Sequence, residues 1–485
     1  MSFFLPEILV EAPVGDTITL EYDKPLWVMA STLPFSQGFT YGSYADISGI
    51  SLKGGHPKGN AVFLNGILIN QPQNSYVDLT DISPFLFGNL SVYEGGFSPY
   101  SIYGNLNFSY TPGREYYGFL NGFWGFSFGY KGGYGGFDLG NLTGGRDSLF
   151  YAEGVFLYDK GFGDLRVSRK RTSGMGGFPQ TSGIQTDIRV VMGYGDFNIL
   201  ILGREWRDEF IYSYHTNLRA GYKWDVFGYK LLTYAEGIKS SNIGEKIRPL
   251  IYLGRNFYVF GGYISGNLWY DGKRMGFGSF LSFPIKLLTF NSSFSNRIPS
   301  FDELYWKGAG AEGNPNLKNE KTFTISSEFK FKGLQISGFF RRIWDIIEWR
   351  NVGGIWRPEN SSAGNIWGIS LYVGFGFLRF KYDRLYAYYD NGKRMIYRPK
   401  NTYSVLLSYK PFSLSLLYLD PRFTNPANTR FVDYILNLNL SLNLDIKGYN
   451  LTFGIDNLLN RKNYFVEGYP SRGKVAFLLF SKQFI

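Results

Sequence analysis

The sequence predicts an all-β protein whose strands close into a transmembrane antiparallel β-barrel. The first observation is composition: Phe, Tyr and Trp make up 19% of the 485 residues, and 61 residues are glycine. Aromatic residues favour strands and glycine favours turns. The second observation is a two-residue alternation of apolar and polar side chains. The third is an alternation of long and short connections between successive strands.

The two-residue period is clearest in two segments. In 436–444 every even position is leucine, and every odd position is asparagine or serine. In 322–332 the apolar residues at 323, 325, 329 and 331 alternate with Thr, Glu and Lys. Such strands have one apolar and one polar face. Soluble β-sandwiches share this pattern, so it does not by itself predict a membrane barrel.

The connections favour the barrel over the sandwich. Tight turns are expected at Lys332-Gly333, 374–377, Lys410-Pro411 and Lys447-Gly448, and longer connections at 351–365, 391–401, 420–430 and 459–473. A transmembrane barrel keeps long loops on one rim and tight turns on the other. A Greek-key sandwich has no reason to keep this order.

The number of strands sets the domain organisation. About 20 candidate strands follow Tyr116, which leaves roughly 18 residues for each strand and its connection. Barrels of about 22 strands enclose a lumen that needs a plug. We therefore expect a barrel of about 20–22 strands over residues 113–485, a plug domain in its lumen over 14–112, and a separate segment over 1–13.

Composition excludes several classes of function. The chain has no cysteine and only two histidines, His56 and His215. With no serine motif near either histidine, we expect no catalytic residue, no metal site and no cofactor. Mean hydropathy is −0.15, and no apolar run approaches the roughly 18 residues of a spanning helix. Residues 1–13 show no signal-peptide pattern.

The chain is basic, with 50 Lys and Arg against 39 Asp and Glu. This balance fits an anionic ligand or lipopolysaccharide phosphates, but also lysines and arginines that only solubilise loops. Four basic residues form a cluster that is expected to lie in a Gly/Ser-rich loop: Arg166, Arg169, Lys170 and Arg171. This cluster could attract an anionic cargo, but contact with lipopolysaccharide or plain solvation is the favoured interpretation. No nucleic-acid partner is expected.

Three segments near the N-terminus resemble the plug of TonB-dependent receptors. They are Ile50-Ser-Leu-Lys-Gly-Gly55, Val62-Phe-Leu-Asn-Gly-Ile-Leu-Ile-Asn-Gln-Pro72 and Val92-Tyr-Glu-Gly-Gly-Phe-Ser-Pro-Tyr-Ser-Ile-Tyr-Gly104. Their order and spacing match the family. Two departures concern the family's Arg-Gly pairs, which here read Lys53-Gly54 and Glu94-Gly95. The Gly-rich segment after Gly104 is also short, so the plug is expected to be a shortened one.

The barrel carries further resemblance. Asn296-Arg-Ile-Pro-Ser-Phe-Asp-Glu-Leu-Tyr305 and Gly313-Asn-Pro-Asn-Leu317 resemble the family's large extracellular loop, and Gly454-Ile-Asp-Asn-Leu-Leu-Asn460 resembles the final hairpin of cobalamin and siderophore receptors. The resemblance implies a monomer in the outer membrane, in contact with lipopolysaccharide and outer-membrane lipid. It also implies import of a scarce bulky nutrient by an energy-coupled rearrangement of the plug.

The resemblance assigns an energy-coupling segment. Between Pro6 and Pro13 the chain resembles a TonB box, which adds as a strand to the inner-membrane partner TonB. Its residues are Glu7, Ile8, Leu9, Val10, Glu11 and Ala12. By resemblance to cobalamin-type receptors, ligand-contacting plug loops fall at 36–43 and 70–76. Aromatic and amide side chains there are the expected contacts: Phe39, Tyr41, Gln71, Gln73, Asn74 and Tyr76.

The cargo follows from the same resemblance. A cobalamin-like corrinoid is the first expectation and a ferric siderophore the second. Haem is not expected, because no histidine lies between Arg297 and Leu317, and His56 is expected low in the plug. The alternatives are a passive porin or adhesin, and, with much less support, an outer-membrane enzyme.

Overall fold

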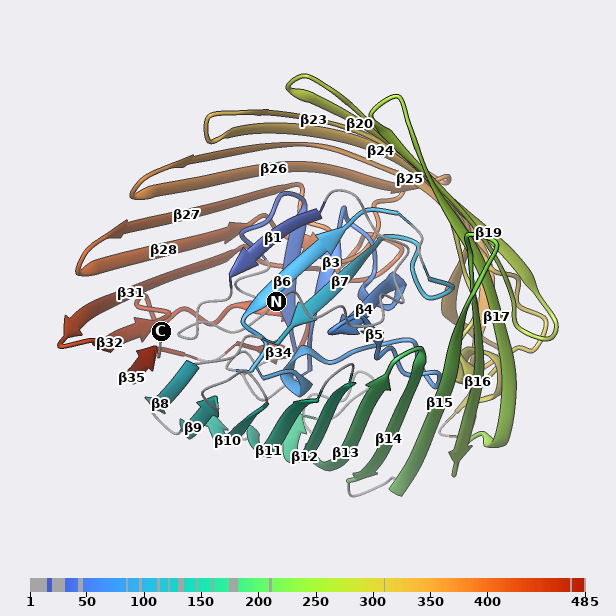
Figure 1. Cartoon of the computed structure of the whole chain (residues 1–485), viewed down its shortest axis with the longest axis horizontal. Helices are drawn as coiled ribbons and strands as arrows, with labels where there is room; N and C mark the ends of the chain where they lie inside the picture. Colours follow the sequence, from blue (N-terminus) through green and yellow to red (C-terminus); the bar gives the residue numbers. More distant parts are fainter. Residues whose placement is uncertain are drawn as a thin grey trace.

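The computed structural model describes residues 15–19, 31–41, 47–83, 86–95, 98–110, 114–120, 123–129, 135–144, 147–158, 161–173, 182–208, 212–308, 310–471 and 473–483. A ring of strands encloses a smaller mixed sheet (Figure 1). The ring closes where β35 (Val475–Gln483) pairs antiparallel with β8 (Arg114–Leu120). The predicted all-β barrel is therefore confirmed.

The inner sheet has the order β1-β6-β7-β4-β5, and β2 pairs with β3 beside it. Strands β4 and β7 run parallel, whereas the other pairs of this domain are antiparallel. The elements are β1 (Gly15–Thr19), β2 (Ser36–Thr40), β3 (Ser48–Leu52), η1 (Pro57–Gly59), β4 (Asn60–Leu64), β5 (Ile67–Leu68), η2 (Leu79–Asp81), β6 (Asn89–Tyr93) and β7 (Gly104–Ser109).

The plug has an apolar core, in which Ala61, Leu64, Phe87, Leu90 and Phe108 are fully buried, and the same cluster continues into wall side chains such as Phe162 and Leu250. It therefore fills the lumen as a folded unit.

The first thirteen barrel strands follow one another around the ring. They are β8, β9 (Phe123–Gly129), β10 (Gly135–Gly144), β11 (Asp147–Tyr158), β12 (Gly161–Ser173), β13 (Ser182–Tyr194), β14 (Phe197–Arg207), β15 (Tyr212–Val226), β16 (Tyr229–Ser240), β17 (Gly244–Val259), β18 (Gly262–Tyr270), β19 (Met275–Ile285) and β20 (Leu288–Arg297).

Nine more strands complete the ring. They are β23 (Glu320–Phe331), β24 (Leu334–Val352), β25 (Ile355–Phe375), β26 (Leu378–Tyr389), β27 (Asn401–Tyr409), β28 (Phe412–Leu419), β31 (Ile435–Ile446), β32 (Tyr449–Asp456) and β35. The described part of the chain thus forms twenty-two wall strands, at the upper end of the predicted range and one hairpin above the count of about 20 from the sequence. The connections hold α2 (Phe301–Tyr305), β21 (Lys307–Gly308), β22 (Ala311–Glu312), β29 (Arg422–Phe423), β30 (Phe431–Val432), β33 (Tyr464–Val466) and β34 (Tyr469–Pro470).

Side chains alternate between lipid and lumen along each wall strand. In β15, Tyr214 and Leu218 are exposed on the outer surface, whereas His215, Asn217 and Arg219 are buried against the plug. Exposed aromatic rings lie at both edges of the outer surface. Phe227 and Phe260 lie at the turns that follow β15 and β17, and the stacked Trp367–Tyr386 and Tyr382–Tyr403 pairs lie near the opposite rim, where β26 ends. Such girdles mark the two membrane interfaces of a transmembrane barrel.

The connections form two unlike rims. The predicted tight turns Lys332-Gly333 and Lys447-Gly448 are both present, with positive φ at each residue, as a type I′ hairpin turn requires. We call this edge the short-turn rim. The opposite edge, the long-loop rim, carries the connections 298–319, 390–400, 420–434 and 457–474.

One predicted loop is wrong. Residues 351–365 were expected as a long connection, but β24 and β25 pair up to a tight turn at Gly353-Gly354. Both glycines have positive φ, which permits the turn. The hairpin projects beyond the wall, where its strands do not contact lipid and need no apolar face. Its polar residues therefore lack the apolar–polar alternation from which strands were predicted.

No helix in the described ranges has the length and apolar character needed to cross a membrane.

Candidate functional site

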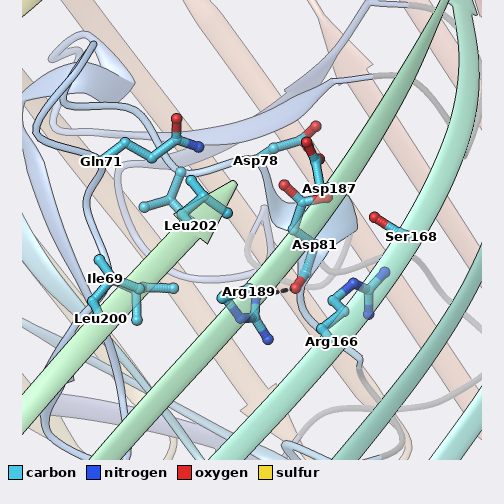
Figure 2. A pocket seen from close by; sticks show the side chains of 11 residues that line it. Ile69, Gln71, Asp78, Asp81, Arg166, Ser168, Asp187, Arg189, Leu200 and Leu202 are labelled. Carbon is cyan, nitrogen blue, oxygen red and sulfur yellow. Dashed lines mark hydrogen bonds between the residues drawn. The ribbon is translucent and has the colours of Figure 1, made fainter. Parts of the chain in front are cut away.

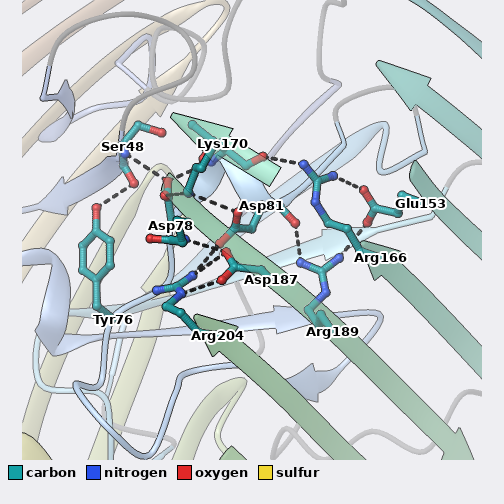
Figure 3. A network of polar contacts seen from close by, with 12 residues as sticks. Ser48, Tyr76, Asp78, Asp81, Glu153, Arg166, Lys170, Asp187, Arg189 and Arg204 are labelled. Carbon is teal, nitrogen blue, oxygen red and sulfur yellow. Dashed lines mark hydrogen bonds and ion pairs between the residues drawn. The ribbon is translucent and has the colours of Figure 1, made fainter. Parts of the chain in front are cut away.

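A buried network of charges fixes the plug to strands β12–β14. The 3-10 helix η2 supplies Asp78 and Asp81, and Figure 3 shows both carboxylates facing basic side chains of the wall. Lys170 Nζ lies 2.5 Å from Asp78 Oδ2 and 3.3 Å from Asp81 Oδ1. Arg204 Nη2 lies 3.2 Å from Asp81 Oδ2, and the Lys170 side chain is fully buried.

Local hydrogen bonds orient these two carboxylates. Asp78 is the N-cap of η2, and its Oδ1 accepts from the backbone N–H groups of Thr80 and Ser48, each at 3.0 Å. Burial by itself raises the pKa of Asp81, but Lys170 and the neighbouring arginines outweigh it and hold that pKa at about 2. Asp81 is therefore charged at neutral pH, and its ion pairs persist.

Two further arginines join the network through the plug backbone. Arg166 Nη2 donates to Thr80 O at 2.8 Å, and Arg189 Nη1 donates to Asp81 O. Glu153 pairs with both arginines inside the wall. A cavity of about 20 Å³ remains beside them, next to Gln71 (Figure 2). A space of this size holds about one water.

A second anchor joins the plug to β15–β17. Tyr100 of the plug donates its hydroxyl to Glu236 at 2.6 Å, and Glu236 also pairs with Arg219 and Arg248, each at 2.7 Å. Arg219 donates in addition to the plug carbonyls of Leu68 and Asn70, at 3.1 and 2.9 Å.

The wall at β23–β26 holds the plug through backbone carbonyls. Arg341 donates to the carbonyls of Leu52, Lys53 and Tyr103 at 3.0–3.2 Å, and Lys381 donates to those of Leu33 and Ser36 at 3.0 and 3.1 Å. A cavity of about 80 Å³ lies on this side, between the plug and β20, β23 and β24. This cavity is larger than the one described at β12–β14.

The plug residues that replace the family's arginines pair with each other. Lys53 Nζ lies 2.5 Å from Glu94 Oε1. Glu94 Oε2 then accepts a 2.8 Å hydrogen bond from Ser326 of β23. Burial raises the pKa of the Glu94 carboxyl, but Lys53 and Ser326 outweigh this effect and lower it. Glu94 therefore contacts this wall through the hydroxyl of Ser326, whereas Asp78 and Asp81 pair with cations of the wall at β12–β14.

The loop 298–319 closes over part of the plug. Ser300 and Glu303 form a capping box that starts α2, and Arg297 Nη1 pairs with Glu303 at 3.0 Å. The backbone N–H groups of Phe301 and Asp302 donate to the carbonyls of Pro72 and Gln73, at 3.1 and 2.7 Å. We call this contact the α2 clasp.

The predicted ligand residues fall into two groups. Phe39, Tyr41 and Tyr76 lie together: the Phe39 and Tyr41 rings are 6.1 Å apart, and an added Cβ on Gly49 would meet both Phe39 and Tyr76 at 2.7 Å. Tyr41 also packs on Tyr469 of the long-loop rim, with ring centroids 5.2 Å apart. Burial raises the pKa of Tyr41 to about 12, with Tyr397 and Tyr469 contributing, so it is a neutral phenol.

The second group is engaged with neighbouring protein. Gln71 and Gln73 are 3% and 5% exposed, and Gln73 lies beneath the α2 clasp with its backbone N–H donating to Asn217 Oδ1. Asn74 Oδ1 accepts from the backbone N–H of Tyr76 at 2.9 Å. Phe39, Tyr41 and Tyr76 are therefore half-buried, whereas the two glutamines are buried.

Other predicted features fall as follows. The TonB-box residues Glu7–Ala12 lie outside the described residues. His215 is buried in β15, with Nδ1 2.8 Å from Ser240 Oγ. His56 is exposed, and Arg398 of the long-loop rim donates to nearby Gly54 O. The expectation that His56 lies low in the plug is therefore wrong. The described residues contain no cluster of acidic and histidine side chains suited to a metal ion.

The basic cluster at 166–171 is not a loop, which corrects the sequence prediction. It lies on β12, where Arg166 and Lys170 point into the lumen and Arg169 and Arg171 point outward. The two-residue period of a strand separates them. Contact of the outward arginines with lipopolysaccharide stays a prediction.

The sequence reasoning missed the partners of this cluster, among them Asp78, Asp81, Arg189 and Arg204. A signal was present in β13, where Gln185, Asp187 and Arg189 alternate with Ile184, Thr186 and Ile188. Charged residues that alternate in this way with residues of a lipid-facing side point into the lumen and need partners there.

Comparisons with known proteins agree with this architecture. A family model described as "TonB dependent receptor-like, beta-barrel" matches residues 64–458. The vitamin B12 transporter BtuB of Photobacterium profundum is 29% identical over 161 residues, which are 30% of this chain and 26% of that protein. BtuB of Vibrio vulnificus is 36% identical over 81 residues, 16% of this chain and 13% of that protein. The matches thus span about a quarter or less of these relatives.

Solved structures share the fold over nearly the whole chain. A mutant ferric enterobactin receptor of Pseudomonas aeruginosa, in complex with enterobactin, aligns with a TM-score of 0.69 at 13% identity, over 98% of this chain and 100% of that one. The FrpB iron transporter of Neisseria meningitidis aligns with a TM-score of 0.67 at 11% identity, over 97% and 99%. At such identities the likeness concerns the fold.

Proposed function

Since the chain belongs to the TonB-dependent receptor family, whose members reside in the outer membrane, we propose that it imports a scarce, bulky nutrient by an energy-coupled rearrangement of its plug. The proposed cargo is a cobalamin-like corrinoid or a ferric siderophore. The moving part is the plug, residues 14–112, and the route is the lumen of the barrel. TonB is the proposed energy-transducing partner, and the receptor acts as a monomer.

The observation that carries this proposal is the way in which the plug is held. Besides apolar packing, its contacts with the wall include buried ion pairs and hydrogen bonds to backbone carbonyls, as at Lys170 and Arg341. Leaving one charge of a buried ion pair without its partner costs about 3–5 kcal/mol. Several such anchors keep thermal opening rare, so passage of a bulky cargo needs an external source of energy.

In the sequence, the proposed coupling segment lies close to the first strand of the plug, so force on it would reach the plug. Strand β1 begins at Gly15, soon after Glu7–Ala12 in the sequence, and pairs with β6 over Asn89–Tyr93. Pairing of Glu7–Ala12 with TonB as an added strand therefore applies tension to the edge of the plug sheet. Glu94, which bonds to the wall, directly follows β6.

Growth of a deletion strain tests the proposal. The strain is supplied with a panel of iron chelates and corrinoids, with and without the wild-type chain, in backgrounds that contain or lack TonB. We expect at least one nutrient to support growth only when both the chain and TonB are present. Growth that needs the chain but not TonB would indicate a passive pore and would contradict the proposal.

A further inference from the structure

The outer face of the wall carries two cations on neighbouring strands near the long-loop rim. Strands β25, β26 and β27 lie side by side there (Figure 1). Arg384 of β26 is exposed and lies directly opposite Ile369 of β25, which is 57% exposed on the outer surface. Directly opposed residues share one face of a sheet, so Arg384 points outward. Lys400 directly precedes β27, and its carbonyl accepts from the backbone N–H of Leu385 at 2.8 Å.

One aromatic ring brings the two cations together. Arg384 Cζ lies 5.2 Å from the ring centroid of Tyr386, and Lys400 Nζ lies 5.7 Å from the same centroid. The Tyr386 hydroxyl also accepts a 2.5 Å hydrogen bond from Arg384 Nε. Tyr386 in turn stacks on Trp367 of β25, with ring centroids 3.9 Å apart. Rings and hydroxyls position a cation without neutralising it, so two positive charges are held at one place.

No carboxylate compensates these two charges. Within the ranges that the structure describes, neither Arg384 nor Lys400 forms an ion pair. Asp420, on the connection after β28, accepts instead from the backbone and side-chain N–H groups of Asn401, at 3.0 and 2.6 Å. Other outward cations near this rim do pair with carboxylates: Lys239 with Glu245, Lys321 with Asp345, and Arg342 with Asp390. Arg384 and Lys400 therefore suit an anion from outside the protein.

Below the two cations, towards the short-turn rim, the outer face becomes apolar. Tyr382 and Tyr403 stack with ring centroids 4.8 Å apart. The outward positions that follow on the same three strands are Leu371, Val373, Phe380, Val405 and Leu407. From the rim towards the middle of the membrane, this face thus presents cations, then aromatic rings, then an apolar surface. The same order of polarity is found in a lipid that has an anionic head group.

The position of the cations indicates which lipid they meet. Long connections of a transmembrane barrel face the outside of the cell, so Arg384 and Lys400 lie at the head groups of the outer leaflet. The lipid of that leaflet is lipopolysaccharide, whose lipid A part is an acylated glucosamine disaccharide with two phosphates. Lys and Arg bind phosphate through charge-assisted hydrogen bonds. Two uncompensated cations favour such a ligand over a zwitterionic phospholipid, which brings a cation of its own.

We propose that the outer face of β25–β27 is a binding site for the lipid A part of lipopolysaccharide. Arg384 and Lys400 bind its phosphate, a sugar ring lies against Trp367 and Tyr386, and acyl chains cover the apolar surface below. We call these four residues the lipid A patch. The patch lies on other strands than the outward arginines of β12, and its ligand is independent of the cargo that the receptor imports.

Native mass spectrometry of the purified full-length chain in detergent tests the ligand. The chain is titrated with three lipids: bisphosphorylated lipid A, monophosphorylated lipid A and phosphatidylglycerol. We expect bisphosphorylated lipid A to bind roughly tenfold more tightly than phosphatidylglycerol, with the monophosphorylated form between them. The affinity should fall as the salt concentration rises. Equal affinity for bisphosphorylated lipid A and phosphatidylglycerol would overturn the assignment of the ligand.

Two matched double variants test the patch. Arg384→Gln with Lys400→Gln should weaken binding of bisphosphorylated lipid A by roughly 10- to 30-fold, because two cations near its phosphates are lost. Lys321→Gln with Arg342→Gln removes the same charge from the same outer face, where both cations already pair with carboxylates, so a change below about threefold is expected. Should the first double variant fail to fold, Arg384→Gln alone replaces it, with an expected loss of roughly fivefold. Equal effects at the patch and at the control pair would overturn the proposal.

Discussion

Replacing Lys170 by methionine should loosen the plug, because Lys170 is the central cation of its attachment to β12–β14. Its Nζ contacts Asp78 Oδ2 at 2.5 Å, Asp81 Oδ1 at 3.3 Å and Thr80 Oγ1 at 3.3 Å, and the side chain is fully buried. Methionine keeps most of the volume but removes the charge. Asp78 would then be a buried carboxylate without a cation.

The structure sets the expected magnitude. Loss of one partner from a buried ion pair costs about 3–5 kcal/mol. Asp81 keeps Arg204 at 3.2 Å, and Asp78 keeps the backbone N–H groups of Ser48 and Thr80, so the lower end, about 3 kcal/mol, is expected. At about 1.4 kcal/mol per tenfold change, the displaced plug should be populated roughly 100-fold more often.

Conductance of single molecules in a planar bilayer measures this opening directly. Lys223→Met is the matched control, because Lys223 pairs at 3.7 Å with Asp196, a partly exposed residue of the barrel wall. Asp78→Asn combined with Lys170→Met should restore part of the closure, since it removes the unpaired charge. Equal open probability in Lys170→Met and Lys223→Met would refute the assignment of this network as the anchor.

Two further predictions concern the α2 clasp and the coupling segment. Burial raises the pKa of the Asp302 carboxyl to about 7, with Lys58 and Gln73 opposing the shift. In the unfolded chain the pKa of an Asp carboxyl is about 3.9. Because the pKa of Asp302 is higher in the folded state, its charged form destabilises the fold. This destabilisation disappears as the pH falls from about 7 to about 4. Hydrogen exchange of the backbone amides in the α2 clasp, corrected for the intrinsic exchange rate, should therefore become slower as the pH is lowered from 8 to 6. The Asp302→Asn variant should not show this change. If the variant still shows it, another titrating group is responsible. Leu9→Pro should abolish uptake and preserve cargo binding, because proline removes a backbone donor from the segment that pairs with TonB, while Leu9→Ala should keep both. Uptake by Leu9→Pro at the wild-type rate would place the TonB-binding segment elsewhere.

Much of the fold could be predicted from local sequence because a barrel wall is a repeated two-residue pattern with short turns. Lys332-Gly333 and Lys447-Gly448 indicate hairpins by residue type alone. The hairpin at 351–365 could not be predicted in this way. It leaves the wall, so its strands lack the apolar face that identifies the others.

The candidate site was harder to predict because its parts come from distant segments. The tyrosines Tyr41 and Tyr76 were expected at the cargo face from the resemblance alone, and the structure places them together. Gln73 lies beneath α2, a contact between residues more than 200 positions apart in the chain, and Gln71 lines the cavity at β12–β14. The role of Lys170 depends on Asp78, 92 residues earlier, and no local pattern links the two.

Movement of the plug against the wall is the central claim, and a reversible cross-link tests it most directly. The chain has no cysteine, so Glu94→Cys with Ser326→Cys introduces one defined pair, at a site where the native side chains are 2.8 Å apart. Bridging this pair with a short reducible dithiol reagent should stop energised uptake, and reduction should restore it in the same sample.

The matched control bridges two neighbouring strands of the wall. Ser408→Cys with Ser413→Cys joins β27 to β28, where the hydroxyl oxygens are 3.4 Å apart. This bridge should leave uptake unchanged, because the barrel is closed and does not rearrange. Undiminished uptake through a receptor whose Glu94→Cys and Ser326→Cys thiols are fully bridged would contradict the rearrangement of the plug at this wall.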